Sequence, residues 1–112
     1  MDCIDHDAAA RARAAADRVA AEAVLEVLQA AADSVRLRLL AAVVEQPGLC
    51  ACDLAWVVDR QKSLVSHHLK RLRDAGLVVS EREGRLVRFE ATGQGAGLVR
   101  AVGELAGTEV AA

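Results

Sequence analysis

Aromatic residues are scarce in this 112-residue chain, in which Trp56 and Phe89 are the only two. Proteins that bind single-stranded nucleic acids rely on stacking bases against aromatic rings, so the composition disfavours that class. Long apolar runs are missing as well. The longest strongly apolar run, Leu39 to Val44, is far shorter than the ~18–20 residues of a membrane span, and the opening residues MDCIDHD lack the pattern of a signal peptide. We therefore expect a cytoplasmic protein with no membrane partner.

Charge is unevenly distributed, although the net charge is only −2. Residues 1–59 hold ten acidic and five basic side chains, whereas residues 60–90 hold eight basic and four acidic ones. A basic block in an acidic chain is either a surface that binds phosphate groups or a solvent-exposed face of mixed charge. The length is that of one domain. Because a chain this short buries little apolar surface by itself, we expect it to share a hydrophobic core with a partner subunit.

Apolar periodicity predicts a mainly helical domain over residues 8–112, after a flexible polar arm over residues 1–7. The alanine-rich stretch from Ala8 should form two helices that divide near Ala20–Glu22. A third helix begins after a break at Asp33-Ser34 and ends at Gln46-Pro47-Gly48. Its expected buried stripe consists of Leu37, Leu40, Ala41 and Val44.

The middle of the chain has the pattern of a helix-turn-helix. A short helix over residues 51–58 and a turn at Asp59-Arg60 precede a longer helix over residues 61–76. Hydroxyl, imidazole and amine groups on one face of the longer helix suit base edges and phosphates. We expect its core stripe to be Val65, Leu69 and Leu72, and its DNA-binding residues to be Lys62, Ser63, Ser66, His67, Lys70 and Arg71.

Two β-rich runs, LVVSER and RLVRFEA, flank Glu83-Gly84 and predict a hairpin. Arg82, Arg85 and Arg88 on or beside its tip are further candidate DNA contacts. A hairpin that follows a helix-turn-helix makes a winged helix-turn-helix, a mainly α fold with a small β-hairpin. The final helix, about Gly95 to Ala106, presents Leu98, Val102 and Leu105 on one side and suits a dimer contact.

Three cysteines are the candidates for site chemistry. Cys50 and Cys52 flank one residue at a helix start, and Cys3 lies in the arm. Three thiols in a cytosolic protein indicate metal binding or redox chemistry rather than a disulfide framework. Thiolates select Cd(II), Pb(II), Zn(II) or trivalent arsenic. Two thiols leave a coordination shell incomplete, so Cys3 is the expected third ligand. His6, Asp5 and Asp7 are weaker candidates for a fourth.

Other interpretations of the cysteines stay open. In one interpretation, Cys50 and Cys52 only contribute to packing. In another, they react with oxidants in a thiol redox sensor. An enzyme is disfavoured, because no pattern places a histidine beside a cysteine with an orienting carboxylate. We expect His67 to face DNA and His68 to face the core, since neighbouring helical residues point about 100° apart. Trp56 is expected in the core.

Four stretches resemble the ArsR/SmtB family of metal-responsive repressors over about residues 22–92. They are AAADSVRLRLL, LCACDLA, SLVSHHLKRLRDAGLV and EREGRLVRFEA. The chain departs from the family pattern at Gln61, where Ser or Thr is usual, at Asp59, where a turn glycine is usual, and at Ser34-Val35, in place of Pro-Thr.

This resemblance implies a homodimer that binds double-stranded operator DNA when metal-free and is released when metal binds. It is closest to the cadmium/lead branch, in which N-terminal ligands reach the Cys-x-Cys of the other subunit. The zinc branch's Asp and His ligands are missing from the final helix, and Ala55 stands where an arsenic branch has its third cysteine. An arsenite-responsive repressor with a three-sulfur site made with Cys3 stays an alternative.

Overall fold

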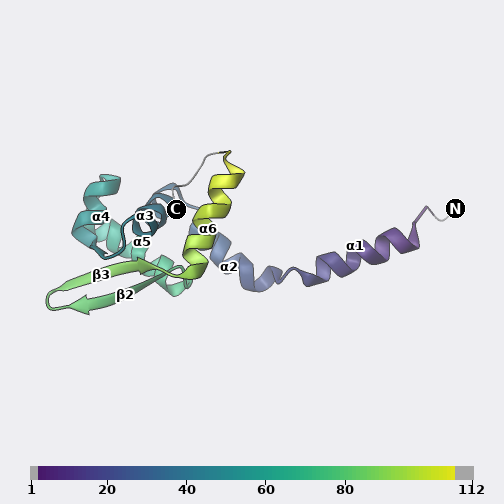
Figure 1. The fold of residues 1–112 in the computed structure, drawn as a ribbon, viewed down its shortest axis with the longest axis horizontal. Helices are drawn as coiled ribbons and strands as arrows, with labels where there is room; N and C mark the ends of the chain where they lie inside the picture. Colours follow the sequence, from purple (N-terminus) through teal and green to yellow (C-terminus); the bar gives the residue numbers. More distant parts are fainter. Residues whose placement is uncertain (1–2, 108–112) are drawn as a thin grey trace.

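The computed structural model describes residues 3–107, which form six helices and a small antiparallel sheet (Figure 1). A mainly α winged-helix fold is therefore confirmed. Within these residues no helix combines the length and apolarity needed to cross a bilayer. The helices are α1 (His6–Arg18), α2 (Ala21–Ala31), α3 (Ser34–Glu45), α4 (Ala51–Val58), α5 (Lys62–Asp74) and α6 (Gly93–Leu105), and the strands are β1 (Leu49–Cys50), β2 (Val78–Glu83) and β3 (Leu86–Ala91).

Helix α1 begins at His6, two residues before the predicted start at Ala8. Asp5 caps it by accepting a hydrogen bond from the Ala8 N–H at 3.0 Å, which draws the end of the expected arm into the helix. The predicted division of the alanine-rich stretch is confirmed, with α1 and α2 separated by Val19 and Ala20. No residue of α1 is buried, and α1 projects away from the rest of the chain (Figure 1).

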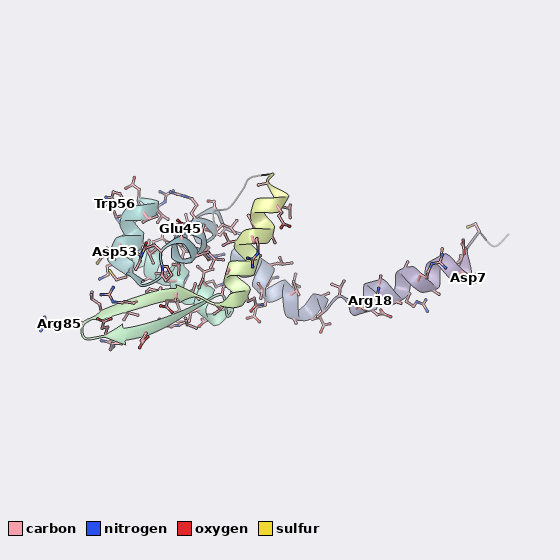
Figure 2. The ribbon with its side chains drawn as sticks, in the orientation of Figure 1. Asp7, Arg18, Glu45, Asp53, Trp56 and Arg85 are labelled. Atoms are coloured by element: carbon pink, nitrogen blue, oxygen red, sulfur yellow. The ribbon has the colours of Figure 1, made fainter. Side chains whose placement is uncertain are left out.

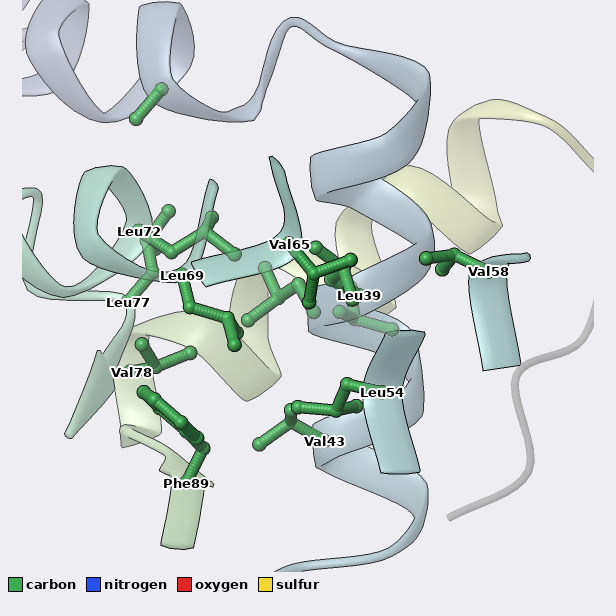
Figure 3. Packing of buried hydrophobic residues seen from close by; sticks show 13 residues of the cluster. Leu39, Val43, Leu54, Val58, Val65, Leu69, Leu72, Leu77, Val78 and Phe89 are labelled. Carbon is green, nitrogen blue, oxygen red and sulfur yellow. The ribbon is translucent and has the colours of Figure 1, made fainter. Parts of the chain in front are cut away.

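The core lies where α3, α4, α5 and the sheet meet (Figure 3). The predicted stripe of α5 is confirmed, since Val65, Leu69 and Leu72 are fully buried. The predicted stripe of α3 is partly wrong, because α3 packs against helices on several sides. Its buried residues are Leu39, Leu40 and Val43, whereas Leu37 and Val44 are half-buried and Ala41 is exposed.

Trp56 is not in the core. It is 85% exposed, whereas Leu54 and Val58 of the same helix are fully buried. A residue two positions from each of them on an α-helix points about 160° away, which turns the indole outward. The apolar character of Trp56 suggested burial, but the phase of α4 determines its exposure.

Backbone conformation at two positions shapes the helix-turn-helix. Asp59 adopts a left-handed conformation with φ 54°, which ends α4 and turns the chain towards α5. An aspartate tolerates this conformation better than most residues, which accounts for its presence where glycine is usual. Gly76, with φ 79°, follows the end of α5 as predicted.

The hairpin pairs Val78 with Ala91 at one end and Glu83 with Leu86 at the tip. The predicted turn at Gly84 is confirmed, with φ 63°. The sequence did not predict β1, which pairs with β3 and makes a three-stranded sheet of order β1-β3-β2. The final helix begins two residues before the predicted Gly95, because Thr92 caps it through a hydrogen bond from the Gly95 N–H at 3.0 Å.

Candidate functional site

Helix α5 presents the polar face that the sequence predicted. Ser63, Ser66, His67 and Lys70 are all exposed, as is Lys62 in its first turn. The Lys70 ammonium donates to Asp74 one turn later at 3.0 Å, which holds the pKa of the Asp74 carboxyl below its ordinary value. Arg71 is half-buried and lies between the polar face and the core face.

The arginines of the hairpin divide into two kinds. Arg82 of β2 and Arg85 of the turn are exposed, and Arg85 lies at the tip in Figure 2. Arg88 is half-buried, and its guanidinium donates to the Gly48 carbonyl at 2.9 Å and to Glu83 at 3.0 Å. The interactions of Arg88 are thus internal, unlike those expected of a tip residue.

Cys50 lies at a junction between the sheet and α4. It is the last residue of β1, opposite Arg88 of β3, and it caps α4. Its backbone N–H and its thiol both donate to the Asp53 carboxylate at 3.2 Å. These two hydrogen bonds lower the pKa of Asp53. Asp53 is thus a polar neighbour of the thiol that the sequence analysis missed, although its position three residues after a helix cap is a known signal.

Cys50, which caps α4, and Cys52 in its first turn line one cleft together with basic residues of α5 and the hairpin. The cleft has a volume of about 380 Å³. Cys50 and Cys52 line it, as do Lys62 and Ser66 of α5. The residues that line it are Cys50, Ala51, Cys52, Lys62, Ser66, Lys70, Arg73, Arg85, Leu86, Val87 and Phe89. The sequence pattern does not predict that the thiols and the DNA-binding face share one cleft, nor that Arg73 lines it.

The arm is remote from this cleft within one chain. Cys3 precedes α1, whose N-terminal end lies at the far end of the molecule from α4 (Figure 1). Asp5, His6 and Asp7 share that location. Over residues 3–107, no group of three or more His, Cys, Asp or Glu side chains is arranged to hold a metal ion. A single chain therefore brings Cys50 and Cys52 together, but not with Cys3.

His68 and Arg36 form a polar contact behind the recognition face. As predicted, His68 is buried and faces the core. Its Nδ1 lies 3.1 Å from Nη1 of Arg36, and the Nε of Arg36 donates to the Ala30 carbonyl. Since the nitrogens of a guanidinium group donate hydrogen bonds and do not accept them, Nδ1 of His68 is the acceptor. This contact joins α5 to α3 and to the end of α2.

The short helix, the turn, the exposed polar helix and the basic hairpin together define a winged helix-turn-helix regulator. Residues 33–80 match the family described as bacterial regulatory protein, arsR family. A cadmium resistance transcriptional regulatory protein, CadC, from Listeria innocua is 32% identical over 89 residues, which cover 80% of this chain and 75% of the relative. The chain belongs to the ArsR/SmtB family of DNA-binding transcriptional repressors.

Two further proteins resemble it. A transcriptional repressor SmtB homolog from Synechocystis is 44% identical over 69 residues, which cover 62% of this chain and 52% of that protein. NolR from Sinorhizobium fredii has the same fold, with a TM-score of 0.72 and 23% identity over 97% of this chain and all of the other.

Proposed function

We propose that the chain is a homodimeric repressor that binds operator DNA when metal-free and is released when a soft metal ion binds its thiols. The observation that carries this proposal is the shared cleft, in which Cys50 and Cys52 lie beside Lys62 and Ser66. Whatever binds the thiols there acts next to side chains suited to phosphate and base contacts. As a regulator of transcription it would act in the cytoplasm.

The polar face of α5 suits the major groove of double-stranded DNA, where base edges are distinguishable. Ser66 and His67 would contact base edges, while Lys62 and Lys70 would contact phosphates. Arg85 at the hairpin tip, with Arg82 beside it, would contact the backbone next to the groove. Each of these side chains is exposed, so contact with DNA requires no unfolding.

The donors at the cleft fit a soft ion only in part. Cys50 and Cys52 supply two thiols, and Cd(II), Pb(II), Zn(II) and arsenite all favour sulfur ligands. Asp53 lies within hydrogen-bonding distance of the Cys50 thiol. We expect the third sulfur to come from Cys3, and the distance of α1 from the cleft within one chain (Figure 1) supports Cys3 of a second subunit as its source. A bound ion would supply a positive charge that holds the sulfurs of two subunits together.

Helices α1 and α2 support the proposal of a dimer. A 13-residue helix with no buried residue is marginal by itself in water, so α1 needs a surface to pack on. Val24, Leu25 and Leu28 of α2 are about half exposed, and Leu105 of α6 is 88% exposed. A second copy that covers these side chains would remove apolar surface from water and would place α1 near the partner's body.

A titration tests the proposed function. Reduced protein receives Cd(II), Pb(II), Zn(II) or arsenite while ultraviolet thiolate-to-metal bands and fluorescence anisotropy of operator DNA are followed. We expect a band at stoichiometric metal together with a loss of operator affinity, and the ion with the greatest loss identifies the inducer. Cys50→Ser and Cys52→Ser should abolish both. Release by an oxidant and by none of these ions would favour the thiol redox sensor.

Mixed dimers test the source of Cys3. One chain carries Cys3→Ser and the other carries Cys52→Ser. If the ligands are shared across subunits, one site lacks both Cys3 and Cys52 while the other keeps all three thiols. The heterodimer then binds one ion tightly. With all ligands from one chain, each site lacks one thiol and neither binds normally. A heterodimer without a tight site would therefore exclude the shared arrangement.

A further inference from the structure

The segment around Cys3 and the cleft around Cys50 carry opposite charges. Asp5 and Asp7 follow Cys3 closely, and both are exposed. Lys62, Lys70, Arg73 and Arg85 line the cleft, and among the residues that the structure describes its lining includes no acidic side chain. Two carboxylates lie just outside the lining, Asp53 against the Cys50 thiol and Asp74 against the Lys70 ammonium. Three of the lining cations, Lys62, Lys70 and Arg85, are also proposed to contact the DNA backbone, so an acidic segment in this cleft and DNA would compete for one surface.

Chain length determines how close the two carboxylates come. Asp5 is two residues from Cys3, which spans at most ~7 Å of extended chain. If Cys3 of one subunit shares an ion with Cys50 and Cys52 of the other, Asp5 lies within about one Debye length, ~8 Å at physiological salt, of the site. Asp7 is the second residue of α1, after His6, and lies within a further turn of Asp5. The ion thus brings negative charge to the edge of a cationic cleft.

We propose that residues 3–7 act as an acidic strap. When an ion joins Cys3 to the partner's Cys50 and Cys52, Asp5 and Asp7 occupy the cationic cleft and displace DNA phosphates from Lys62, Lys70 and Arg85. This inference rests on the proposed function, because the ion is what holds the strap in place. By linkage, DNA in the cleft weakens the binding of the strap, and therefore of the ion, by the same factor.

Lysine reactivity tests the strap without any DNA. The chain has only two lysines, Lys62 and Lys70, and both line the cleft. An amine-acylating reagent followed by mass spectrometry therefore reports on the cleft alone, apart from the N-terminal amine. At Cd(II) concentrations that saturate the ultraviolet band, we expect both lysines of the full chain to react about threefold or more slowly than without metal. Equal rates with and without Cd(II) would overturn the strap.

The variant that removes the charge is Asp5→Asn with Asp7→Asn. Asparagine caps a helix as well as aspartate does, so α1 keeps its start. The control is Asp17→Asn with Glu22→Gln, which removes two exposed charges of α1 and α2 far from Cys3 along the chain. Metal should protect the lysines of the control and of the wild type, but not those of the Asp5/Asp7 variant. Protection of all three proteins alike would overturn the strap.

Operator binding separates this inference from the proposed function. At saturating Cd(II), confirmed from the ultraviolet band for each protein, the wild type and the control should lose operator affinity by the same factor. The loss for the Asp5/Asp7 variant should be about threefold to tenfold smaller. A wild type that keeps its operator in Cd(II) would refute the proposed function. If Cd(II) releases DNA equally from the wild type and from the Asp5/Asp7 variant, the strap is refuted and the proposed function is not.

Discussion

Cys50 lies directly opposite Arg88 in the antiparallel pair of β1 and β3. The Arg88 guanidinium also donates to the carbonyl of Gly48, two residues before Cys50. The first thiol of the site and the hairpin therefore belong to one hydrogen-bonded sheet. A ligand that shifts Cys50 would act on the hairpin through this sheet as well as on α4, which Cys50 caps.

Arg85 of the hairpin turn and Arg88 of β3 should differ in how they affect DNA binding. Arg85→Ala removes an exposed cation and should reduce the salt dependence of operator affinity by about one unit of log–log slope. Arg88→Ala should leave that slope unchanged, because its guanidinium is held by Gly48 and Glu83. Anisotropy over a range of salt concentrations measures both slopes. A reduced slope for Arg88→Ala would show that Arg88 contacts phosphate after all.

The polar face of α5 should control operator recognition. Ser66→Ala with His67→Ala should cost about 1–3 kcal/mol in operator affinity and relax sequence preference, as losses of base contacts do. Lys70→Ala should weaken operator and unrelated DNA alike. Arg11→Ala, a change of equal charge on exposed α1, serves as the control in competition binding assays. Unchanged affinity in all the α5 variants would exclude this face as the DNA-binding surface.

The contact between Arg36 and His68 should stabilise the position of α5. Arg36→Ala leaves the buried Nδ1 of His68 and the Ala30 carbonyl without this donor. The expected cost is about 1–3 kcal/mol in the free energy of unfolding, measured by urea denaturation. Arg38→Ala is the control, because Arg38 is exposed and makes only a long contact of 3.5 Å with the Val57 carbonyl. Equal effects of the two variants would contradict a special role for Arg36.

The cap of α3 should make stability depend on pH in the acid range. The Arg36 N–H donates to Asp33, and this bond lowers the pKa of Asp33 below 3.8. Because the folded pKa is depressed, the ionised carboxylate stabilises the protein above the ordinary pKa, and this contribution is lost as pH falls through the folded pKa. Wild type should exceed Asp33→Asn in stability near pH 6, and the difference should shrink below pH 4, measured by urea denaturation. A constant difference would contradict the assignment.

Local sequence signals predicted most of the secondary structure because each depends on a few neighbouring residues. The turn at Gly84, the break before Ser34 and the stripe of α5 are of this kind, and all are confirmed. Strand β1 was missed because two residues carry no period, and its pairing with β3 joins segments about 40 residues apart. The prediction that Trp56 is buried was wrong because it rested on the apolar character of the side chain. The positions of Leu54 and Val58 in α4 turn Trp56 towards solvent.

The composition of the candidate site could be predicted only in part. The two thiols follow from their spacing at the start of α4, and the polar face of α5 follows from spacing within that helix. Their meeting in one cleft depends on how α4, α5 and the hairpin pack, and no local pattern contains that information. The separation of Cys3 from Cys50 within one chain is likewise a property of the tertiary structure, set by the direction in which α1 leaves the body.

Two glycines of α6 should respond oppositely to alanine. A Cβ on Gly95 would lie 2.2 Å from the Leu77 carbonyl oxygen, so α6 can pack this closely only without a side chain there. Gly95→Ala should destabilise the protein by about 1–3 kcal/mol, the usual cost of overpacking. Nothing lies within 4 Å of a Cβ on Gly97, so Gly97→Ala should stabilise the helix by about 0.5–1 kcal/mol. Urea denaturation of both variants at one protein concentration measures the difference, and a destabilised Gly97→Ala would indicate that a second subunit covers that position.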